Sequence, residues 1–450
     1  MLLRFISLLI VTLASSLFAG LYGLPKQAPS VASGIKSDLG VFANNRSIEP
    51  TPSEVESRLL RQIEPLIAQD PRAAIRRLQA IGNSFSGPIV PFLLGSLYLQ
   101  ENQLNQAERS LKQAVAIFPS FRRAHRNLAF LYYKKDDPVR AIPHWQKVLQ
   151  LGGGDSTSFG LLAYGLLEQG SIEAALRAYE NALIYDPQNA DWLRGQANCL
   201  MRLGDWPRAL GVLEALVALF PKDTSLVLSY AQTLVKMEQM EVAIATLEVL
   251  RLEPSPSREA LLLLGDLYFN EELFDRASDA WLSVLSTNPD ALSLEVWLQK
   301  IEVLAQQDQW KQAETLLRQM QRTWRSQNIN QYPAFIRLKA KMDLANGIAD
   351  RAVNALEKLI KIDPLDGTAL LLLADHYAVN GAEENAVFLY ERARGIAETE
   401  WSAIIGLARL KIAQGTLDQA IPLLRSAYQK RPTAALKTYL ERVDSLSTFD

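Results

Sequence analysis

Small residues recur at a constant interval of 34 along most of this chain, and at two separate positions of the interval. One series runs through Gly95, Ala129, Ala163, Ala197, Ala231 and Gly265, and the other through Ala107, Ala141, Ala175, Ala209, Ala243 and Ala277. Both resume downstream, the first at Ala340, Ala374 and Ala408 and the second at Ala352, Ala386 and Ala420. A fixed step of this length predicts one supersecondary unit repeated along the chain, because an ordinary bundle has no reason to keep it.

Each interval contains two helical patterns separated by a polar turn. Leu94, Leu97 and Tyr98 have helical spacing before the turn, and a second apolar pattern begins at Leu104. Prolines close the second helices at Pro119, Pro187, Pro221, Pro289, Pro364 and Pro432. A glycine inside a helix costs about 1 kcal/mol relative to alanine. Gly95 is therefore explained if two antiparallel helices approach closely there, with Ala107 facing it.

This pattern resembles the tetratricopeptide repeat. The residues that carry the resemblance are Gly95, Tyr98, Ala107, Ala114 and Pro119 in one unit and Gly265, Tyr268, Ala277, Trp281 and Pro289 in another. The resemblance implies an all-α fold, a right-handed superhelical solenoid of about ten helix–turn–helix units.

Seven segments are expected along the chain. They are a signal peptide or transmembrane anchor (1–24), a flexible linker (25–53), a capping or degenerate repeat (54–87), a regular array (88–291), an irregular repeat with an insertion (292–332), a second array (333–433), and a C-terminal capping helix and tail (434–450).

The N-terminal segment differs from the repeats. Arg4 precedes an apolar run over residues 5–24, with small residues at Ala19 and Gly20. This order is typical of a cleaved secretory signal. The run is also long enough to remain as a membrane anchor. Both readings predict a periplasmic protein, either soluble after cleavage or anchored to the inner membrane.

Composition excludes several classes of function. The net charge is −2, so the basic excess of a nucleic-acid-binding protein is absent. The single cysteine, Cys199, excludes a disulfide framework and a cysteine-based zinc site. His125 and His144 are nineteen residues apart and His376 is remote, so no metal-ligand spacing exists. No catalytic residue, cofactor or metal is expected.

The resemblance implies that the first helices line a concave groove. Its expected lining is Phe92, Arg126, Phe130, Tyr133, Tyr164, Arg194, Asn198, Met201, Arg202, Asp266 and Phe269. Aromatic and arginine side chains suit an extended protein segment, although the same residues would also serve packing between repeats. Arg194 and Asn198 imitate part of a clamp for a C-terminal carboxylate, but Ser229 and Glu259 stand where the clamp needs an amide and a basic residue.

The step changes to 36 and then 39 between Ala277 and Ala352. One reading is a second partner surface formed by Arg318, Arg322, Trp324 and Arg325. The other is a longer helix whose tryptophan fills a widened seam and whose arginines are solvated.

These features predict a non-enzymatic scaffold that binds protein partners or extended peptides and organises an envelope assembly for pilus formation, secretion or exopolysaccharide export. The alternative is a carbohydrate-binding solenoid in polysaccharide export or cell-wall metabolism, with Phe130, Tyr133, Tyr164 and Trp192 as stacking platforms.

Overall fold

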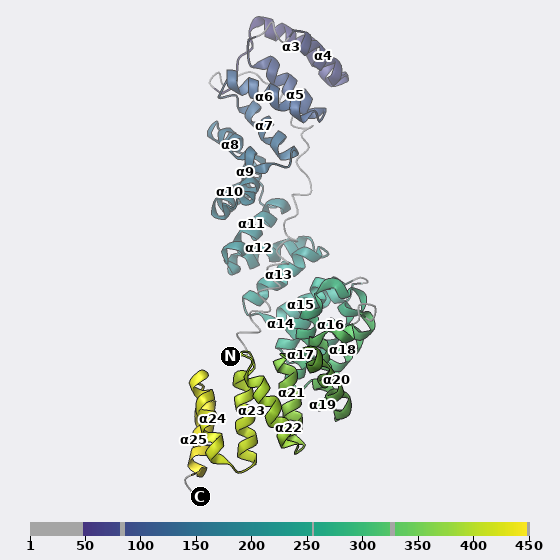
Figure 1. Ribbon diagram of the computed structural model, residues 1–450. Coiled ribbons are helices and arrows are strands. Elements are labelled where there is room, and N and C mark those ends of the chain that lie inside the picture. Colours follow the sequence, from purple (N-terminus) through teal and green to yellow (C-terminus); the bar gives the residue numbers. More distant parts are fainter. Residues whose placement is uncertain (1–47, 82–85, 254–255, 325–328, 448–450) are drawn as a thin grey trace. The chain divides into compact units, whose positions relative to one another are not determined.

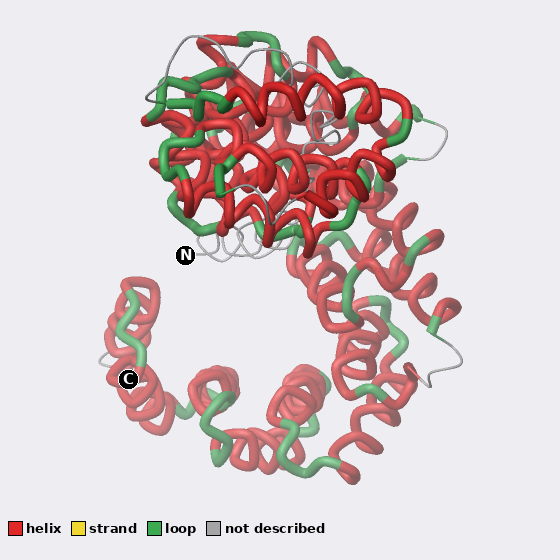
Figure 2. Tube along the Cα trace, turned by 90° about the horizontal axis from the view of Figure 1, so that it is seen from above, coloured by secondary structure: helices red, strands yellow, loops and turns green. Residues whose placement is uncertain are grey.

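A computed structural model describes residues 48–81, 86–253, 256–324 and 329–447. Its described residues form 23 α-helices and two short 3-10 turns, and Figure 2 shows no strand among them. The apolar run over residues 5–24 lies outside the described part. Within that part, no helix is both long enough and apolar enough to span a bilayer. The chain divides into two compact units, Met1–Glu253 and Pro254–Asp450.

Unit 1 is a succession of antiparallel helix pairs that follow one another in chain order (Figure 1). Its helices are α3 (Glu54–Gln69), α4 (Pro71–Ile81), α5 (Ile89–Gln100), α6 (Leu104–Ile117), α7 (Arg122–Lys134), α8 (Pro138–Gln150), α9 (Ser156–Glu168), α10 (Ile172–Tyr185), α11 (Ala190–Leu203), α12 (Trp206–Leu219), α13 (Thr224–Lys236) and α14 (Met240–Arg251).

Unit 2 continues the same pairing and ends in an unpaired helix that packs on α24. Its elements are α15 (Arg258–Asn270), α16 (Phe274–Thr287), η3 (Pro289–Ala291), α17 (Leu294–Gln306), α18 (Trp310–Thr323), η5 (Ile329–Gln331), α19 (Pro333–Ala345), α20 (Ala349–Ile362), α21 (Gly367–Val379), α22 (Glu383–Arg394), α23 (Glu400–Ala413), α24 (Leu417–Lys430) and α25 (Ala434–Ser447). The structure is thus the all-α solenoid expected from the repeat.

The turn inside each helix pair from α5–α6 onward has the same backbone form. One residue adopts positive φ, and the amide of the next residue donates to the carbonyl oxygen five residues before it, as in Gln103 N to Tyr98 O at 2.8 Å. This is a Schellman cap, which satisfies the carbonyls at the end of the first helix. The positive-φ residues are Asn102, Asp136, Gly170, Gly204, Glu238, Glu272, Asp308, Gly347, Gly381 and Gly415. Ten pairs, from α5–α6 to α23–α24, therefore share one turn geometry.

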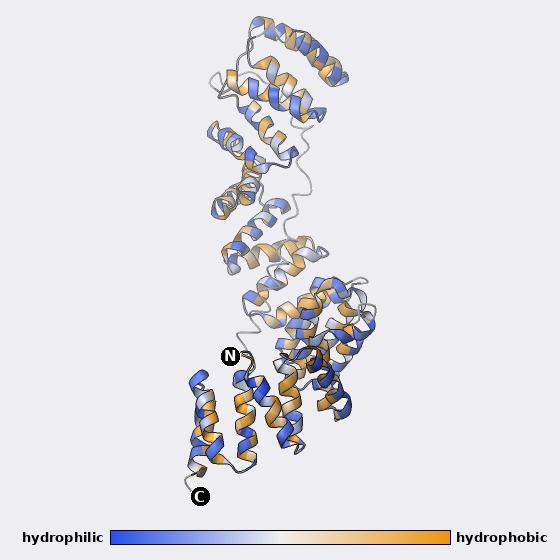
Figure 3. Cartoon of the chain, in the orientation of Figure 1, coloured by the Kyte–Doolittle hydropathy of each residue, from blue (hydrophilic) through white to orange (hydrophobic). Residues whose placement is uncertain are grey.

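The recurring small residues lie where helices approach most closely. A Cβ on Gly95 would meet Leu111 of α6, 2.6 Å from its Cγ and 3.0 Å from its backbone nitrogen. Leu111 is one helical turn beyond Ala107, so the closest neighbour of Gly95 is not the one expected from the sequence. Ala107 and Leu111 are both fully buried. Each helix carries both polar and apolar residues, as Figure 3 shows for α24 and α25. The buried apolar residues form the core between neighbouring helices.

The changed step around Ala313 does not come from a longer helix. Helix α18 spans 14 residues, the same as α16, so that expectation is wrong. The described part of the extra length lies between helices, in η3 and η5. Trp324 ends α18 and is only 6% exposed. The extra residues are therefore connections between pairs, and the helix pair itself is unchanged.

A polar residue at an apolar position of α19 is compensated locally. Asp343 is buried, and both of its carboxylate oxygens accept hydrogen bonds from Arg351 of α20, one of them from Nε at 2.6 Å. A buried carboxylate needs such a bidentate partner to offset its lost hydration. This pair replaces apolar packing in the contact between α19 and α20.

Replacing Gly160 of α9 with alanine should destabilise the protein by about 1–3 kcal/mol through overpacking. A Cβ at this position would lie closer than 3.0 Å to the indole of Trp192. That indole is 5% exposed and donates from Nε1 to Ser156 Oγ at 2.9 Å, so it has little freedom to move. Thermal and urea unfolding followed by circular dichroism would measure the effect.

Gly211→Ala in α12 is the matched control, because nothing lies within 4 Å of a Cβ there. It should stabilise the protein by up to about 1 kcal/mol, the ordinary gain from a helical alanine. If Gly160→Ala stabilised the protein as Gly211→Ala does, close packing would not explain the small residues.

Candidate functional site

The residues expected to line the groove of unit 1 lie on α5, α7, α9 and α11, the first helices of consecutive pairs. We call this side the first-helix face. It does not present all of the expected side chains. Phe92, Phe130 and Met201 are at most 9% exposed. Phe130 packs edge-on against Trp145, and Phe92 lies 4.6 Å from Phe121, centroid to centroid. These side chains contribute to packing and leave little surface for a partner.

Of the aromatic residues expected to line the groove of unit 1, Tyr133 and Tyr164 remain half-exposed. Their rings meet edge to face, with centroids 5.5 Å apart, and so join α7 to α9. Burial, followed by the nearby charges of Asp191 and Asp136, raises the pKa of Tyr133 to about 12. Burial also raises the pKa of Tyr164. Both phenols are therefore neutral hydrogen-bonding groups at physiological pH.

Helix α11 continues this face with charged and amide groups. Arg194 bonds to Asp223 at 2.9 Å, lies 3.8 Å from Asp191, and has its guanidinium 5.1 Å from the ring centroid of Phe220. Burial raises the pKa of Asp191, and Arg194 partly offsets this effect. Arg202 is exposed, whereas Asn198, one turn after Arg194, is 6% exposed.

Two polar atoms of the first-helix face are buried without a hydrogen-bond partner among the described residues. They are the hydroxyl oxygen of Tyr133 and the amide oxygen of Asn198. Buried polar atoms are nearly always satisfied in folded proteins, because leaving one unpaired costs about 1–3 kcal/mol. Arg126, on the same face, is already paired with Asp155 at 3.3 Å. The face therefore combines two rings, fixed ion pairs and two unused hydrogen-bonding atoms.

The expected groove residues of unit 2 have internal roles. Phe269 is 8% exposed and packs against Phe274 and Trp281. Asp266 accepts a hydrogen bond from Nε1 of Trp281 at 2.9 Å and another from Nζ of Lys300. The Lys300 ammonium is buried and lies 4.6 Å from the centroid of the Trp281 ring. Asp266 thus ties α15 to α16 and α17.

The residues of the possible second surface, around residue 320, differ in exposure. Arg318 and Arg322 are exposed, and Arg318 bonds to Glu314 of its own helix at 2.7 Å. Trp324 is buried, and Arg325 lies outside the described residues. The arginines and the tryptophan therefore do not form one exposed patch within the described residues.

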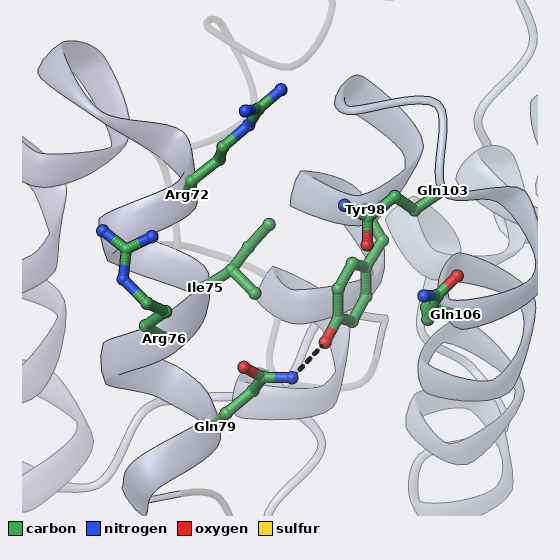
Figure 4. A pocket seen from close by; sticks show the side chains of 7 residues that line it. All are labelled: Arg72, Ile75, Arg76, Gln79, Tyr98, Gln103 and Gln106. Atoms are coloured by element: carbon green, nitrogen blue, oxygen red, sulfur yellow. Dashed lines mark hydrogen bonds between the residues drawn. The ribbon is translucent and has the colours of Figure 1, made fainter.

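A polar pocket of about 310 Å³ lies between α4 and the α5–α6 pair (Figure 4). It is lined by Arg72, Ile75, Arg76, Gln79, Tyr98, Gln103 and Gln106. Inside it, Gln79 Nε2 donates to the Tyr98 hydroxyl at 2.7 Å. Arg72 bonds to Glu101 at 2.8 Å, and Arg76 lies 3.7 Å from Asp70. This pocket was not predicted from the sequence. The only sequence pattern that indicated it is the polar stripe on α4. The charges of its arginines are already balanced by Glu101 and Asp70.

His125 and His144 come together although the sequence placed them nineteen residues apart. Their Nδ1 atoms are 3.0 Å apart, and Nε2 of His125 lies 3.0 Å from the carbonyl oxygen of Pro119. Nε2 of His125 must carry hydrogen to donate to that carbonyl. In neutral rings, His144 Nδ1 is then the donor to His125 Nδ1. The described residues contain no cluster of three metal-binding side chains here or elsewhere.

Cys199 is buried, and burial raises the pKa of its thiol to about 12. A thiol of this kind is neutral and inert at physiological pH. It offers no nucleophile to the first-helix face.

The repeat units match a known family. The family model for the tetratricopeptide repeat matches residues 92–156, 161–224 and 338–400, so the chain contains tetratricopeptide repeats. The curated relative TPR repeat-containing protein YpiA of Bacillus subtilis is 33% identical over 116 residues. That match covers 25% of this chain and only 26% of YpiA, about a quarter of the relative's length.

Solved structures with similar folds include MamA of Desulfovibrio magneticus RS-1, with 18% identity, 38% of this chain and 97% of that chain covered, and a TM-score of 0.35. Another is YrrB, described as a TPR protein with an unusual peptide-binding site. It has 19% identity, 45% and 96% coverage, and a TM-score of 0.36. The fold assignment rests on the helix pairs and the family match, because TM-scores this low add nothing to it.

The histidine pair should make stability depend on pH. Burial first, then the charges of His125, Lys112 and Arg140, lower the pKa of His144 to about 4, from about 6.5 in an unfolded chain. The folded state thus disfavours the protonated ring. Its contribution to stability is complete above pH 6.5 and is lost as the pH falls from there toward 4.

His144→Asn retains an N–H donor but does not titrate, so its midpoint of thermal unfolding should fall less than that of the wild type over this pH range. Parallel losses in the two proteins would show that the pair does not control this dependence.

Proposed function

We propose that this protein is a non-enzymatic scaffold that binds an extended protein segment along the first-helix face of unit 1. The observation that carries the proposal is the pair of unsatisfied buried atoms, Tyr133 Oη and Asn198 Oδ1. The main chain of an extended segment carries amide hydrogens and carbonyl oxygens at regular intervals. Both atoms are covered in the unbound protein, so the two side chains must turn outward on binding. An amide of the bound segment would then donate to Asn198, and a carbonyl would accept from Tyr133.

The surroundings of these atoms fit a peptide better than a catalytic reaction. Tyr133 and Tyr164 provide apolar contact area with few rotatable bonds, which suits recognition. The charged groups nearby, Arg194 and Asp191, are held by one another and by Asp223. No activated nucleophile accompanies them among the described residues of this face. The tetratricopeptide repeats support the same class of function, since stacked repeats create extended binding surfaces.

Carbohydrate binding remains the second candidate but has less support. Of the four proposed stacking platforms, Phe130 is 9% exposed and Trp192 is 5% exposed. A buried ring cannot offer a face to a sugar, so only Tyr133 and Tyr164 remain.

Peptide arrays and glycan arrays probed with the whole protein would separate these candidates. The wild type should retain peptides, and Asn198→Ala should weaken the affinity for a retained peptide about tenfold, since a lost hydrogen bond to a buried group is worth about 1–3 kcal/mol. Tyr133→Phe should weaken it as well. If the peptide arrays were blank and glycans were retained, the carbohydrate reading would replace this proposal.

Asn181→Ala is a matched control for loss of an amide. Asn181 is exposed on the second helix α10 and donates only to Arg177 O of its own helix, at 2.7 Å. Its replacement should leave peptide affinity unchanged. An equal loss of affinity in Asn181→Ala and Asn198→Ala would contradict the assignment of the site.

We further propose that the scaffold works in the cell envelope, where it organises an assembly for pilus formation, secretion or exopolysaccharide export. Support comes from Arg4 and the apolar run over residues 5–24. N-terminal sequencing of the protein purified from each cell fraction is the test. A start near Gly20 would indicate a cleaved signal, and an intact Met1 in the membrane fraction would indicate an anchor. An intact Met1 in the cytosolic fraction alone would contradict both readings.

A further inference from the structure

The chain places a short segment of its own, which precedes α3, against the N-terminal end of α7. Ile48, Glu49 and Pro50 precede α3 in sequence, yet they contact the start of α7. The amide of Arg122 lies 3.5 Å from the carbonyl oxygen of Ile48, and Pro50 is buried. Glu49 and Arg123 are 74 residues apart in sequence. The contact is therefore tertiary, between a short non-helical segment and the helix array.

The anchor of this segment is a carboxylate held by arginine. Arg123 Nε donates to Glu49 Oε2 at 3.2 Å, and Arg122 Nε lies 3.7 Å from Oε1. The side chains of Glu49 and Arg123 are only 13% and 9% exposed. Charge-assisted bonds shielded from water are stronger than those at an open surface. Binding of the segment therefore depends on the negative charge of Glu49.

Aromatic rings support the arginine from the other side. The Arg123 guanidinium lies 5.6 Å from the ring centroid of Phe92 and 5.9 Å from that of Phe121. The two rings are themselves in contact. A guanidinium stacked on aromatic rings is preorganised to bind a carboxylate. The sequence analysis placed Phe92 in the groove as a direct contact, and the structure gives it this supporting position.

The segment is held incompletely. Glu49 Oε1 is buried and accepts no hydrogen bond from the described residues, although it lies within ion-pair distance of Arg122. Burial outweighs the arginines and raises the pKa of Glu49, so its charge is not fully compensated. Only Thr51 and Pro52 separate Pro50 from Ser53, the N-cap of α3. The segment is thus bound mainly through one oxygen of one carboxylate and is kept near its site by a short tether.

We propose that the pocket formed by Phe92, Phe121, Arg122 and Arg123 is a binding site for a short acidic segment of a partner, with a glutamate followed by proline, and that Ile48–Pro50 is its intramolecular competitor. The inference extends the proposed scaffold function by naming the chemistry of one partner. A competitor joined to its site by a short linker has an effective concentration on the order of millimolar. A partner must exceed this competition, so the segment sets a threshold for binding.

The test uses the whole chain and a labelled peptide with the sequence of residues 47–53, SIEPTPS. Glu49→Gln in the chain removes the charge of the competitor and preserves its size. Fluorescence polarisation should then show the variant binding the peptide at least about tenfold more tightly than the wild type does, because the tethered occupant no longer competes well. A peptide with glutamine in place of its glutamate should bind neither protein.

Two further variants locate the site. Arg123→Gln in the Glu49→Gln background should abolish peptide binding, and circular dichroism must show that this variant is folded. Arg122→Gln, at a side chain 35% exposed, should weaken binding less and tests the site if Arg123→Gln does not fold. Equal peptide affinity in the wild type and Glu49→Gln, or no binding to either folded protein, would overturn the inference. Neither result affects the array test of Tyr133 and Asn198.

Discussion

The structure depends on a steric constraint, the close approach of helices at positions that lack a side chain. Gly160 faces Trp192, Gly195 faces Tyr179, and Gly265 faces Trp281. In each case the ring occupies the volume that a methyl group would need. The glycine and the aromatic residue come from different helices, so every such pair joins two elements of the array. Ridge-and-groove packing at this density fixes the angle between neighbours and hence the course of the first-helix face.

Much of the fold follows from the 34-residue interval, and the exceptions have physical causes. The helix pairs follow from the recurring small residues, but the shared Schellman turn does not. Glu238 and Glu272 adopt positive φ although glutamate has no intrinsic preference for it, because flanking helices hold the backbone there. One of the two readings of the longer steps near residue 313 placed the extra residues in a longer helix, and α18 has the ordinary length. Counting residues does not reveal whether an insertion falls in a helix or between helices.

The candidate site was less predictable, because the position of a residue on a helix determines the direction of its side chain but not how far neighbouring side chains cover it. Phe92 and Phe130 point toward the first-helix face but are covered by their neighbours, whereas Tyr133 and Tyr164 remain half-exposed. Pairings between distant residues were also missed. The histidine pair joins two helices of one repeat, and Glu49 meets Arg123 from a segment that was expected to be a linker. No periodic signal marks either contact.

The buried ammonium of Lys300 has a consequence for how the array assembles. The core between the helices is made mainly of apolar side chains, and apolar contacts are not directional. Lys300 of α17 finds its carboxylate only on Asp266 of α15, beside Trp281 of α16. Any other docking would strand a cation in an apolar environment, which is a large penalty. The contact thus specifies which helices pack together, and it lies next to Ala277, after which the 34-residue step of the repeat changes.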